Sequence, residues 1–389
     1  MENRITASAS PLAKLTRPNG HIDKPLTVVT LLLVVIGLMM LYSSSYAYSL
    51  TYYGDSYHYI KNQAVYAVAG LVMMFIVSNI SYRLYYKWAW TLFVVSYVLL
   101  ALTLIMPPVN GARRWIVIGS HTFQPSEIVK FAVIALFARI VADAPERMRE
   151  FKYGFVQPMF ILGLIALVTL NQTHLSGTII ILSIGVVLMF VGGTRIAYFL
   201  MVVGGALPAL GAYVLMSDKM QYAMSRINTW VHPFEYSSKE GYQTVQSLLA
   251  IGSGGLFGMG LGNSRQKQLY IPEPQNDFIF SVVCEELGFI GAVLILCLFI
   301  IYVFRGFRIA LLAKDKFSAL VAIGISSQIG IQTVLNIGVV TNTIPNTGIS
   351  LPFFSQGGTS LLILLVETGI LLSISRYSSS TNIEARDMS

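Results

Sequence analysis

Four carboxylates lie in one short stretch, Ile271–Phe289, that is otherwise apolar enough to enter a membrane. They are Glu273, Asp277, Glu285 and Glu286. Ionisable groups in or beside a span are costly, so they usually face a cavity, pair with a cation or carry function. A carboxylate at the mouth of a span can act as a general base toward a hydroxyl group. The residue type alone leaves a second interpretation for Asp277, an N-cap of the following helix.

Cationic residues that suit a phosphate group occur in the stretch NGARRWIVIGSHTFQPSEIVKFA. Its adjacent Arg113 and Arg114 call for an anionic partner, and the planar donor fork of arginine fits phosphate. Further along, Glu127 and Lys130 are three residues apart on one helix face, so they can pair. The alternative for that pair is a capped helix with one lysine that reaches toward the membrane surface.

A long stretch between apolar segments, about residues 217–276, mixes basic residues, glycines and hydroxyls with aromatic residues. Arg226, Arg265 and Lys267 are its candidates for binding a phosphate group. Its glycines at 258, 260 and 262 are spaced as in a dinucleotide fingerprint, but no strand precedes them. Close packing and tight turns are therefore the favoured explanation of these glycines.

A second connection, TNTIPNTGISLPFFSQGG at residues 341–358, combines prolines and glycines with aromatic and aliphatic residues. Irregular backbone at membrane depth is tolerated only where it is buried in protein or lines water. The composition leaves two alternatives open, a segment that dips into a cavity and an ordinary surface turn.

The elements that must position these groups are membrane spans. Of the 389 residues, 55% are hydrophobic and 11% are charged, and the mean hydropathy is +0.67, which excludes a soluble domain. A span needs roughly 20 apolar residues, and about ten such runs occur. We predict an all-α polytopic membrane protein with about ten transmembrane helices, and a long outer loop between the seventh and eighth. The predicted spans are Leu26–Tyr46, Ala64–Ile80, Ala89–Met106, Ile128–Val141, Val156–Leu170, Thr178–Val191, Ala197–Met216, Phe278–Phe304, Phe317–Val340 and Leu361–Ile374.

Lys and Arg residues in the short connections predict the orientation. Every second connection is basic, from Arg83 and Lys87 to Arg305 and Arg308, so both termini are expected in the cytoplasm. The net charge of +8 then reflects loops near anionic lipid, and nucleic acid is not an expected partner. We divide the chain into a cytoplasmic tail at 1–25, a transmembrane domain at 26–376 and a second cytoplasmic tail at 377–389.

Five motifs in their order and spacing resemble the SEDS family of bacterial shape, elongation, division and sporulation proteins. They are NGARRWIVIG, QPSEIVK, GYQTVQSLLAIGSGGLFGMGLGNSRQK, PEPQNDFIFSVVCEELGFIG and TGISLPFFSQGGTSLL. The resemblance extends from roughly Leu26 to Arg376, and it favours the FtsW and SpoVE branch over RodA.

The resemblance implies a peptidoglycan glycosyltransferase that polymerises lipid II into glycan strands outside the cytoplasmic membrane, during division or sporulation. It implies as partners a class B penicillin-binding transpeptidase and other divisome or sporulation proteins, besides membrane lipid. A lipid-linked precursor transporter and a non-enzymatic scaffold for the transpeptidase are the alternative functions. A transporter should show paired broken helices or an internal repeat, and the sequence shows neither.

The family's essential acidic residue lies in an element written P-E-x-H-T-D-F-I-F, so Asp277 inherits the role of catalytic base. Gln275 and Asn276 replace the His and Thr of that element, and His174 stands where many relatives carry Asp. The leaving pyrophosphate needs cations, which side chains or a divalent metal such as Mg or Mn would supply. The expected substrate-binding residues are Arg113, Arg114, Glu127, Lys130, Arg226, Lys267 and Glu273.

Glu285 and Glu286 lie two turns beyond Asp277, about 12 Å at 1.5 Å per residue, so we assign them to polar pairing between helices. The substrates carry lipid chains that prefer hydrocarbon, together with sugars and phosphates that need polar surroundings. We therefore expect the site to be a groove between spans that receives Asp277 and at least one of the cations, with a gap toward the bilayer.

Overall fold

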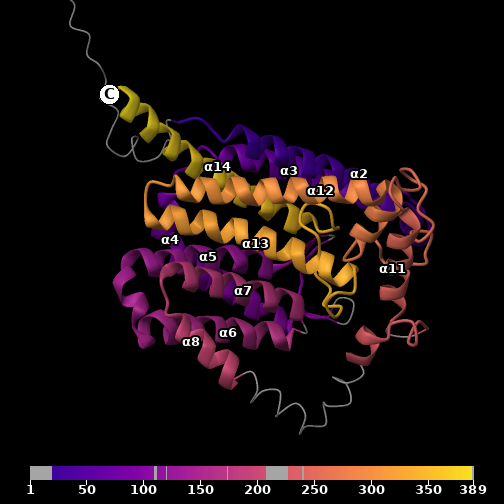
Figure 1. Cartoon of the computed structure of the whole chain (residues 1–389), viewed down its shortest axis with the longest axis horizontal. Coiled ribbons are helices and arrows are strands. Elements are labelled where there is room, and N and C mark those ends of the chain that lie inside the picture. The colour runs from indigo at the N-terminus through magenta and orange to yellow at the C-terminus, as the bar shows by residue number, and fades with distance from the viewer. Residues whose placement is uncertain are drawn as a thin grey trace, which may run out of the picture.

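The computed structural model describes residues 20–108, 112–119, 121–172, 174–206, 227–238 and 241–387. The described chain is a bundle of long helices that lie side by side (Figure 1), as the sequence predicts, with one small two-stranded hairpin. The α-helices are α2 (Lys24–Tyr53), α3 (His58–Val77), α4 (Arg83–Leu102), α5 (Pro125–Asp143), α6 (Gln157–Asn171), α7 (Leu175–Gly192), α8 (Ile196–Met201), α11 (Tyr242–Gly254), α12 (Ile279–Leu311), α13 (Lys316–Val340) and α14 (Gly358–Asp387). Shorter helical turns are η1 (Thr103–Ile105), η2 (Pro145–Arg149), η3 (Lys152–Val156) and η4 (Val202–Ala206).

Eight of the helical segments in the described chain are long and apolar enough to cross a membrane. Helix α5 covers the predicted span Ile128–Val141 but is less apolar, because it carries four charged side chains. Of the predicted span Ala197–Met216, α8 and η4 cover the part up to Ala206, and the rest lies outside the described residues. The predicted spans coincide with helix over most of the length that is described.

The bundle has two distinct ends. Arg305, near the end of α12, forms an ion pair with Asp23, the N-cap of α2. Near the opposite end of α2, the Tyr48 hydroxyl lies 3.5 Å from a carboxylate oxygen of Glu273, which precedes α12. Helices α2 and α12 are therefore antiparallel. We call these the Asp23 end and the α11 end, after the short helix that lies across the second one (Figure 1).

Helix α12 is interrupted at Gly288, whose φ of 67° lies in the left-handed region. The carbonyl groups of Glu285 and Glu286 there accept backbone N–H groups from the loop that follows α11, at 2.9 and 3.0 Å. The loop thus satisfies the backbone groups that the break releases. Positive φ angles at the three loop glycines confirm the predicted tight turns; these are glycines 258, 260 and 262.

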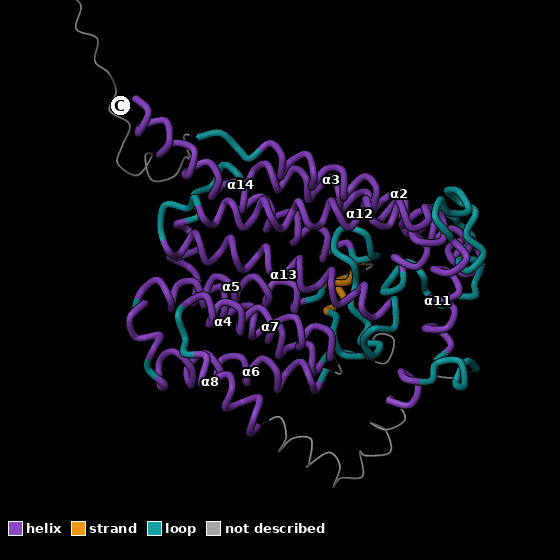
Figure 2. The backbone as a smooth tube through the Cα atoms, in the orientation of Figure 1, coloured by secondary structure: helices purple, strands orange, loops and turns teal. Residues whose placement is uncertain are grey.

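Two short strands form an antiparallel hairpin, β1 (Ile116–Ile118) and β2 (His121–Phe123). Figure 2 shows it among the loops at the α11 end. Gly119 in its turn has a φ of 62°, which glycine adopts without strain. The hairpin joins Arg114, just before β1, to the start of α5, just after β2.

The connection between α13 and α14 is irregular and largely buried. Ile349, Leu351, Phe353 and Phe354 are each at most 3% exposed. The interpretation of this segment as an ordinary surface turn is therefore wrong, and the alternative of a segment that enters the protein is confirmed. Such irregular backbone inside a bundle is characteristic of segments that line a cavity.

Candidate active site

A cavity of about 720 Å³ lies at the α11 end, lined by residues of α2, α3, α5, α7, α13, α14, the hairpin and the loops before α12 and α14. It brings together five of the predicted site residues, Arg114, Glu127, Lys130, Glu273 and Asp277. A second cavity of about 240 Å³ shares Arg114 and Asp277 with it. The predicted meeting of Asp277 with at least one named cation is thus found in the structure.

Asp277 lies just before α12, and its carboxylate faces the cavity. The N-cap of α12 is Phe278, without a side-chain cap, so the interpretation of Asp277 as an N-cap is wrong. The side-chain amide of Asn336 donates to the main-chain carbonyl of Asp277 at 2.7 Å. Gly348 lies directly opposite, because a Cβ at that position would be 3.1 Å from an Asp277 oxygen. Within the described residues, no hydrogen-bond donor reaches the carboxylate.

Burial is the main influence on the protonation of Asp277. It raises the pKa of Asp277 to about 6, the guanidinium of Arg114 opposes the rise, and the nearby Glu273 adds to it. A carboxyl group with a pKa close to neutrality can both lose and accept a proton during a reaction, as a general base must. The chemistry available here is removal of a proton from a hydroxyl group.

The two adjacent arginines separate into different surroundings. Arg114 is partly buried and lines both cavities. Burial lowers the pKa of its guanidinium, while the charge of Asp277 opposes that change. Arg113 is exposed and donates from Nη1 to the carbonyl of Leu104 at 3.0 Å, and it does not line either cavity. Arg114 is therefore the arginine that faces the candidate site.

Glu127 and Lys130 form the predicted pair at the start of α5. The Lys130 Nζ lies 2.8 Å from Glu127 Oε2, and the two side chains are 3% and 10% exposed. The hydroxyl of Ser360, on α14, donates to the same carboxylate at 2.8 Å. Two helices thus hold Lys130 at the cavity wall, and Pro125, whose fixed φ suits a first helical turn, begins α5.

His174 lines the cavity just before α7. Burial, followed by the charges of Arg114 and Lys130, lowers the pKa of His174 to about 3, so its imidazole is neutral. Gln124 lies 3.3 Å from the His174 Nε2. We assign Nε2 as the acceptor of that amide, which places the ring proton on Nδ1. Nδ1 is buried without a hydrogen-bond partner among the described residues.

Glu273 lines the cavity next to the end of α2, where the Tyr48 hydroxyl lies 3.5 Å from its carboxylate. Its backbone is left-handed, with a φ of 47°, an uncommon conformation for a residue with a side chain. The Asn276 amide donates to Glu273 Oε2 at 2.7 Å. Two carboxylates, Glu273 and Asp277, therefore border the same cavity.

The loop before α14 holds the segment that precedes Asp277 in place. The backbone N–H of Gln356 donates to the carbonyl of Gln275 at 2.8 Å. The hydroxyl of Ser355 donates to the carbonyl of Asn276 at 2.6 Å. These bonds fix the loop before α14 against the residues just before Asp277, so that the carboxylate has a defined position.

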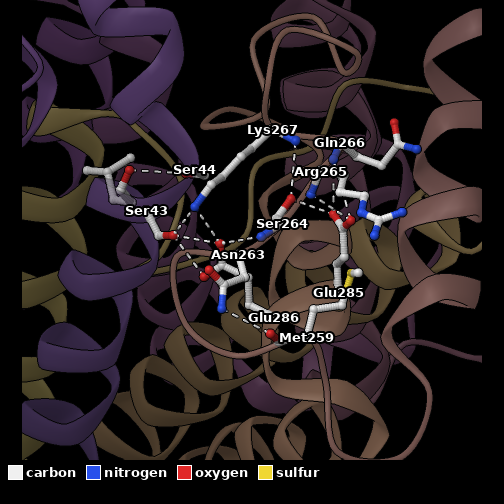
Figure 3. Close-up of polar contacts among 11 residues, drawn as sticks. Ser43, Ser44, Met259, Asn263, Ser264, Arg265, Gln266, Lys267, Glu285 and Glu286 are labelled. Atoms are coloured by element: carbon white, nitrogen blue, oxygen red, sulfur yellow. Dashed lines mark hydrogen bonds and ion pairs between the residues drawn. The ribbon is translucent and has the colours of Figure 1, made fainter.

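The remaining predicted residues lie elsewhere. Lys267 does not line the cavity; its Nζ forms an ion pair with Glu286 at 2.7 Å. Figure 3 shows this group, which we call the closed cluster: Ser43, Ser264, Lys267, Glu285 and Glu286. Arg226 is outside the described residues. Among the residues that the structure describes, no three His, Cys, Asp or Glu side chains gather in a way that would hold a metal ion.

In the closed cluster every charged side chain has partners. Lys267 also donates to the Ser43 hydroxyl at 2.9 Å, and that hydroxyl donates to the Glu286 carboxylate. Glu285 accepts the Arg265 N–H at 2.9 Å and the Ser264 hydroxyl. The expected pairing between helices is thus found for Glu286, from α12 to α2 through Ser43. For Glu285 it is wrong, because the hydrogen-bond partners of its carboxylate lie in the loop after α11.

Sequence reasoning did not single out the aromatic residues of the cavity. Four tyrosines from α2 and α3 line it, together with His58; they are Tyr48, Tyr53, Tyr59 and Tyr66. The signal in the sequence is the tyrosine-rich stretch YAYSLTYYGDSYHY. Tyrosines are common at membrane interfaces, so their number alone does not identify a site.

Comparisons with known proteins agree with this arrangement. The FtsW/RodA/SpoVE family profile, described as "Cell cycle protein", matches residues 24–380. Stage V sporulation protein E of Bacillus subtilis is 43% identical over 360 residues, which cover 92% of this chain and 97% of that protein. A probable peptidoglycan glycosyltransferase FtsW of Geobacter sp. is 36% identical over 365 residues, with 93% and 98% covered.

Solved structures share the fold. A chain of a peptidoglycan synthase complex, described as coordinating polymerization and crosslinking, matches with a TM-score of 0.76 and 27% identity, covering 92% of this chain and 98% of that one. The rod shape determining protein RodA of Thermus thermophilus matches with a TM-score of 0.67 and 28% identity, with 91% and 97% covered. On the extent of these matches, the chain belongs to the FtsW/RodA/SpoVE family, the SEDS proteins.

Proposed function

We propose that this multi-pass membrane glycosyltransferase polymerises lipid II into glycan strands in the cavity at the α11 end, with Asp277 as the general base. The observation that carries the proposal is the Asp277 carboxylate, which opens onto a cavity of about 720 Å³ and has no hydrogen-bond donor among the described residues. Its pKa of about 6 leaves it ionised at neutral pH and able to accept a proton.

In the proposed step, a sugar hydroxyl of the acceptor attacks the anomeric carbon of the donor. A new glycosidic C–O bond forms, and the bond from that carbon to the lipid pyrophosphate breaks. The hydroxyl proton passes to Asp277, and the electron pair of the broken bond leaves with the pyrophosphate. Since pyrophosphate is a good leaving group, the reaction does not need the second carboxylic acid that a glycosidase uses.

The wall formed by Arg114 and Lys130 supports a site for the departing pyrophosphate. Both side chains line the cavity, and the guanidinium fork of Arg114 suits a phosphate group. Polar atoms at the same wall are buried without partners in the described residues, including Ser126 Oγ and His174 Nδ1. Helices α5 and α7 also have their N-termini at this wall, and the dipole at a helix N-terminus favours negative charge. Arg113 has no direct role in this proposal.

Glu273 supports a second function in the same cavity, that of orienting the acceptor. Its carboxylate is held by Asn276 at 2.7 Å and can accept a hydrogen bond from a sugar hydroxyl. It also keeps the pKa of Asp277 raised through charge repulsion. We assign Lys267, in contrast, to the closed cluster and not to substrate binding.

The proposed orientation places the cavity at the outer face and both termini in the cytoplasm. Arg305 and Lys316 lie at the Asp23 end, at the two sides of the connection between α12 and α13. Positively charged connections favour the cytoplasmic side of a membrane. With the basic end inside, Asp277 lies at the level of the outer headgroups, where lipid-linked sugars are polymerised in this proposal.

A class B penicillin-binding transpeptidase is the proposed partner, along with other division or sporulation proteins. The solved relative described as a peptidoglycan synthase complex couples polymerization to crosslinking, which supports a similar assembly here. Glycan strands made at the outer face need a crosslinking enzyme nearby, so a stable complex would deliver each product directly.

The decisive experiment is polymerisation of lipid II by the purified protein with its cognate transpeptidase. Asp277→Asn keeps the size of the side chain and removes the base, so we expect a loss of at least about 100-fold. Asp55→Asn is the matched control, because Asp55 is an exposed aspartate that pairs with Lys61 outside the cavity. Near-normal synthesis by a well-folded Asp277→Asn protein would overturn the assignment, and would favour a scaffold or transporter.

A further inference from the structure

We propose that the tyrosines of the cavity form a saccharide-binding platform for the sugar rings next to the bond that is being made. The inference rests on the proposed function for its location, and it adds a site that the reaction scheme leaves unassigned. The platform consists of Tyr48, Tyr53, His58, Tyr59 and Tyr66, all of which line the cavity.

The rings are held in a fixed arrangement before any ligand binds. Tyr53 stacks on His58 with centroids 3.9 Å apart and an interplanar angle of 6°. Tyr59 meets Tyr53 edge to face, with centroids 5.6 Å apart, and their hydroxyls lie 3.5 Å from each other. Tyr66 packs over Gly358 at the start of α14, where a larger side chain would collide with the ring. Little side-chain freedom is therefore lost on binding.

The chemistry of this wall suits a sugar. An aromatic ring has a negative face, and the C–H bonds on one face of a hexose ring are weakly positive, so the two surfaces stack. Asn62 and Gln356 line the same cavity, and their amides can donate to and accept from hydroxyl and acetamido groups. A phosphate group, in contrast, is served by the cationic wall at Arg114 and Lys130.

The platform also connects directly to the reacting groups. The Tyr48 hydroxyl lies 3.5 Å from Glu273 Oε1, and Glu273 and Asp277 border the same cavity. A saccharide that rests on the tyrosines would thus extend from the general base along α2 and α3. The cationic wall consists of Arg114, just before β1, and Lys130 on α5, so sugar and pyrophosphate occupy different walls.

The competing explanation is that these tyrosines form a belt at the membrane interface. The neighbouring Tyr57 distinguishes that explanation from the saccharide platform. Tyr57 is 51% exposed and Tyr53 is 52% exposed, yet Tyr57 does not line the cavity. It stacks instead on Tyr42, with centroids 5.4 Å apart. If the tyrosines only anchor the protein in the membrane, the two positions should be equivalent.

The test measures binding of a soluble β-1,4-linked N-acetylglucosamine tetrasaccharide to the full-length Asp277→Asn protein in detergent, by titration calorimetry. Tyr53→Ala and Tyr59→Ala should each raise the dissociation constant about tenfold. Tyr53→Phe, which keeps the ring, and Tyr57→Ala should each change it by less than about twofold. Equal binding by Tyr53→Ala and Tyr57→Ala, or no binding by the parent protein, would overturn the platform.

A second measurement separates this inference from the proposed function. In the active protein, which retains Asp277, Tyr53→Ala should raise the KM for lipid II and shorten the glycan products. Tyr57→Ala should change neither. If lipid II is polymerised normally by Tyr53→Ala and Asp277→Asn is inactive, the platform is wrong and the general base stands. If no variant or parent polymerises lipid II but the tetrasaccharide binding depends on Tyr53, the platform stands and the proposed reaction fails.

Discussion

The α11 end of the molecule contains two groups of buried charged residues that differ in how completely their polar atoms are paired. In the closed cluster, Lys267 and Glu286 are 3% and 0% exposed and lie 2.7 Å apart, and serines and backbone N–H groups satisfy what remains. At the cavity, Arg114 Nε and His174 Nδ1 are buried without partners in the described residues, and Asp277 faces open space.

This difference in pairing distinguishes buried charges that have a structural role from those that are available to a ligand. A charge inside a membrane protein is costly, so its presence alone suggests function. When a buried charge is fully paired, its partners in the fold offset the cost of removing it from water. A buried polar atom without a partner keeps that cost until a ligand supplies a hydrogen bond. By this criterion the closed cluster anchors the loop after α11 to the broken helix α12, and the cavity is the place where we propose that substrates bind.

The largest effect on stability should come from breaking the closed cluster. Lys267→Met leaves Glu286 without its cation, and we expect the free energy of unfolding to fall by about 3–5 kcal/mol. Denaturant unfolding in detergent measures this change. Lys61→Met is the control, because the Lys61–Asp55 pair is exposed and should contribute little to stability.

The double variant Lys267→Met with Glu286→Leu should recover much of that loss, since it removes both charges together. If Lys267→Met were as stable as the parent protein and instead bound lipid II poorly, the closed cluster would have to be counted as part of the substrate site.

The pH dependence of the reaction follows from the raised pKa of Asp277. A general base must be ionised, so the rate should be level above a pH of about 6 and should fall about tenfold per unit below it. Arg114 lowers this pKa, so Arg114→Gln should move the acid limb to higher pH. Initial rates of lipid II polymerisation across this range test both statements. A limb near pH 4, the ordinary range of an aspartate, would contradict the role of burial.

The two adjacent arginines provide a smaller contrast within the cavity wall. Arg114→Lys keeps the charge and loses the planar fork, so we expect about a tenfold loss of kcat/KM. Arg113→Lys should change kcat/KM by less than about twofold, because Arg113 is exposed and bonds the Leu104 carbonyl. Equal losses for the two changes would contradict the assignment of the pyrophosphate to Arg114 and not to Arg113.

The smallest expected effect is on the melting temperature of the protein and comes from the charge of Asp277. The folded-state pKa of Asp277 lies above its ordinary value, so ionisation is disfavoured in the folded protein and its charge destabilises the fold above a pH of about 6. Asp277→Asn removes that charge and should raise the melting temperature by about 1–3 °C at neutral pH. Below a pH of about 4 the difference should vanish, since Asp277 is then protonated in both states. A lower melting temperature would show that Asp277 supports the fold.

Much of the architecture could be predicted because membrane spans require long apolar runs. The positions of Asp277 and of the Glu127–Lys130 pair also followed from local spacing and from the family motif. The partner of Lys267 could not be predicted, because Glu286 becomes its neighbour only through the break at Gly288. Nor could adjacent residues such as Arg113 and Arg114 be told apart before the hairpin was known.

The aromatic wall was missed for a different reason. Tyrosines at the ends of spans have a general role at membrane interfaces, and only the three-dimensional arrangement separates Tyr53, inside the cavity, from Tyr57, outside it. The irregular segment before α14 was ambiguous in the same way, since its composition suited both a surface turn and the buried loop that the structure contains.

Photocrosslinking of a lipid II analogue tests most directly whether substrates bind in the cavity and not at the closed cluster. The analogue would carry a diazirine on its sugar, and the Asp277→Asn protein would prevent its turnover. Peptide mapping should place cross-links in the cavity-lining segments, residues 48–66, 112–130 and 348–360, and unlabelled lipid II should compete them away. Competed cross-links confined to residues 256–269, around the closed cluster, would contradict the account.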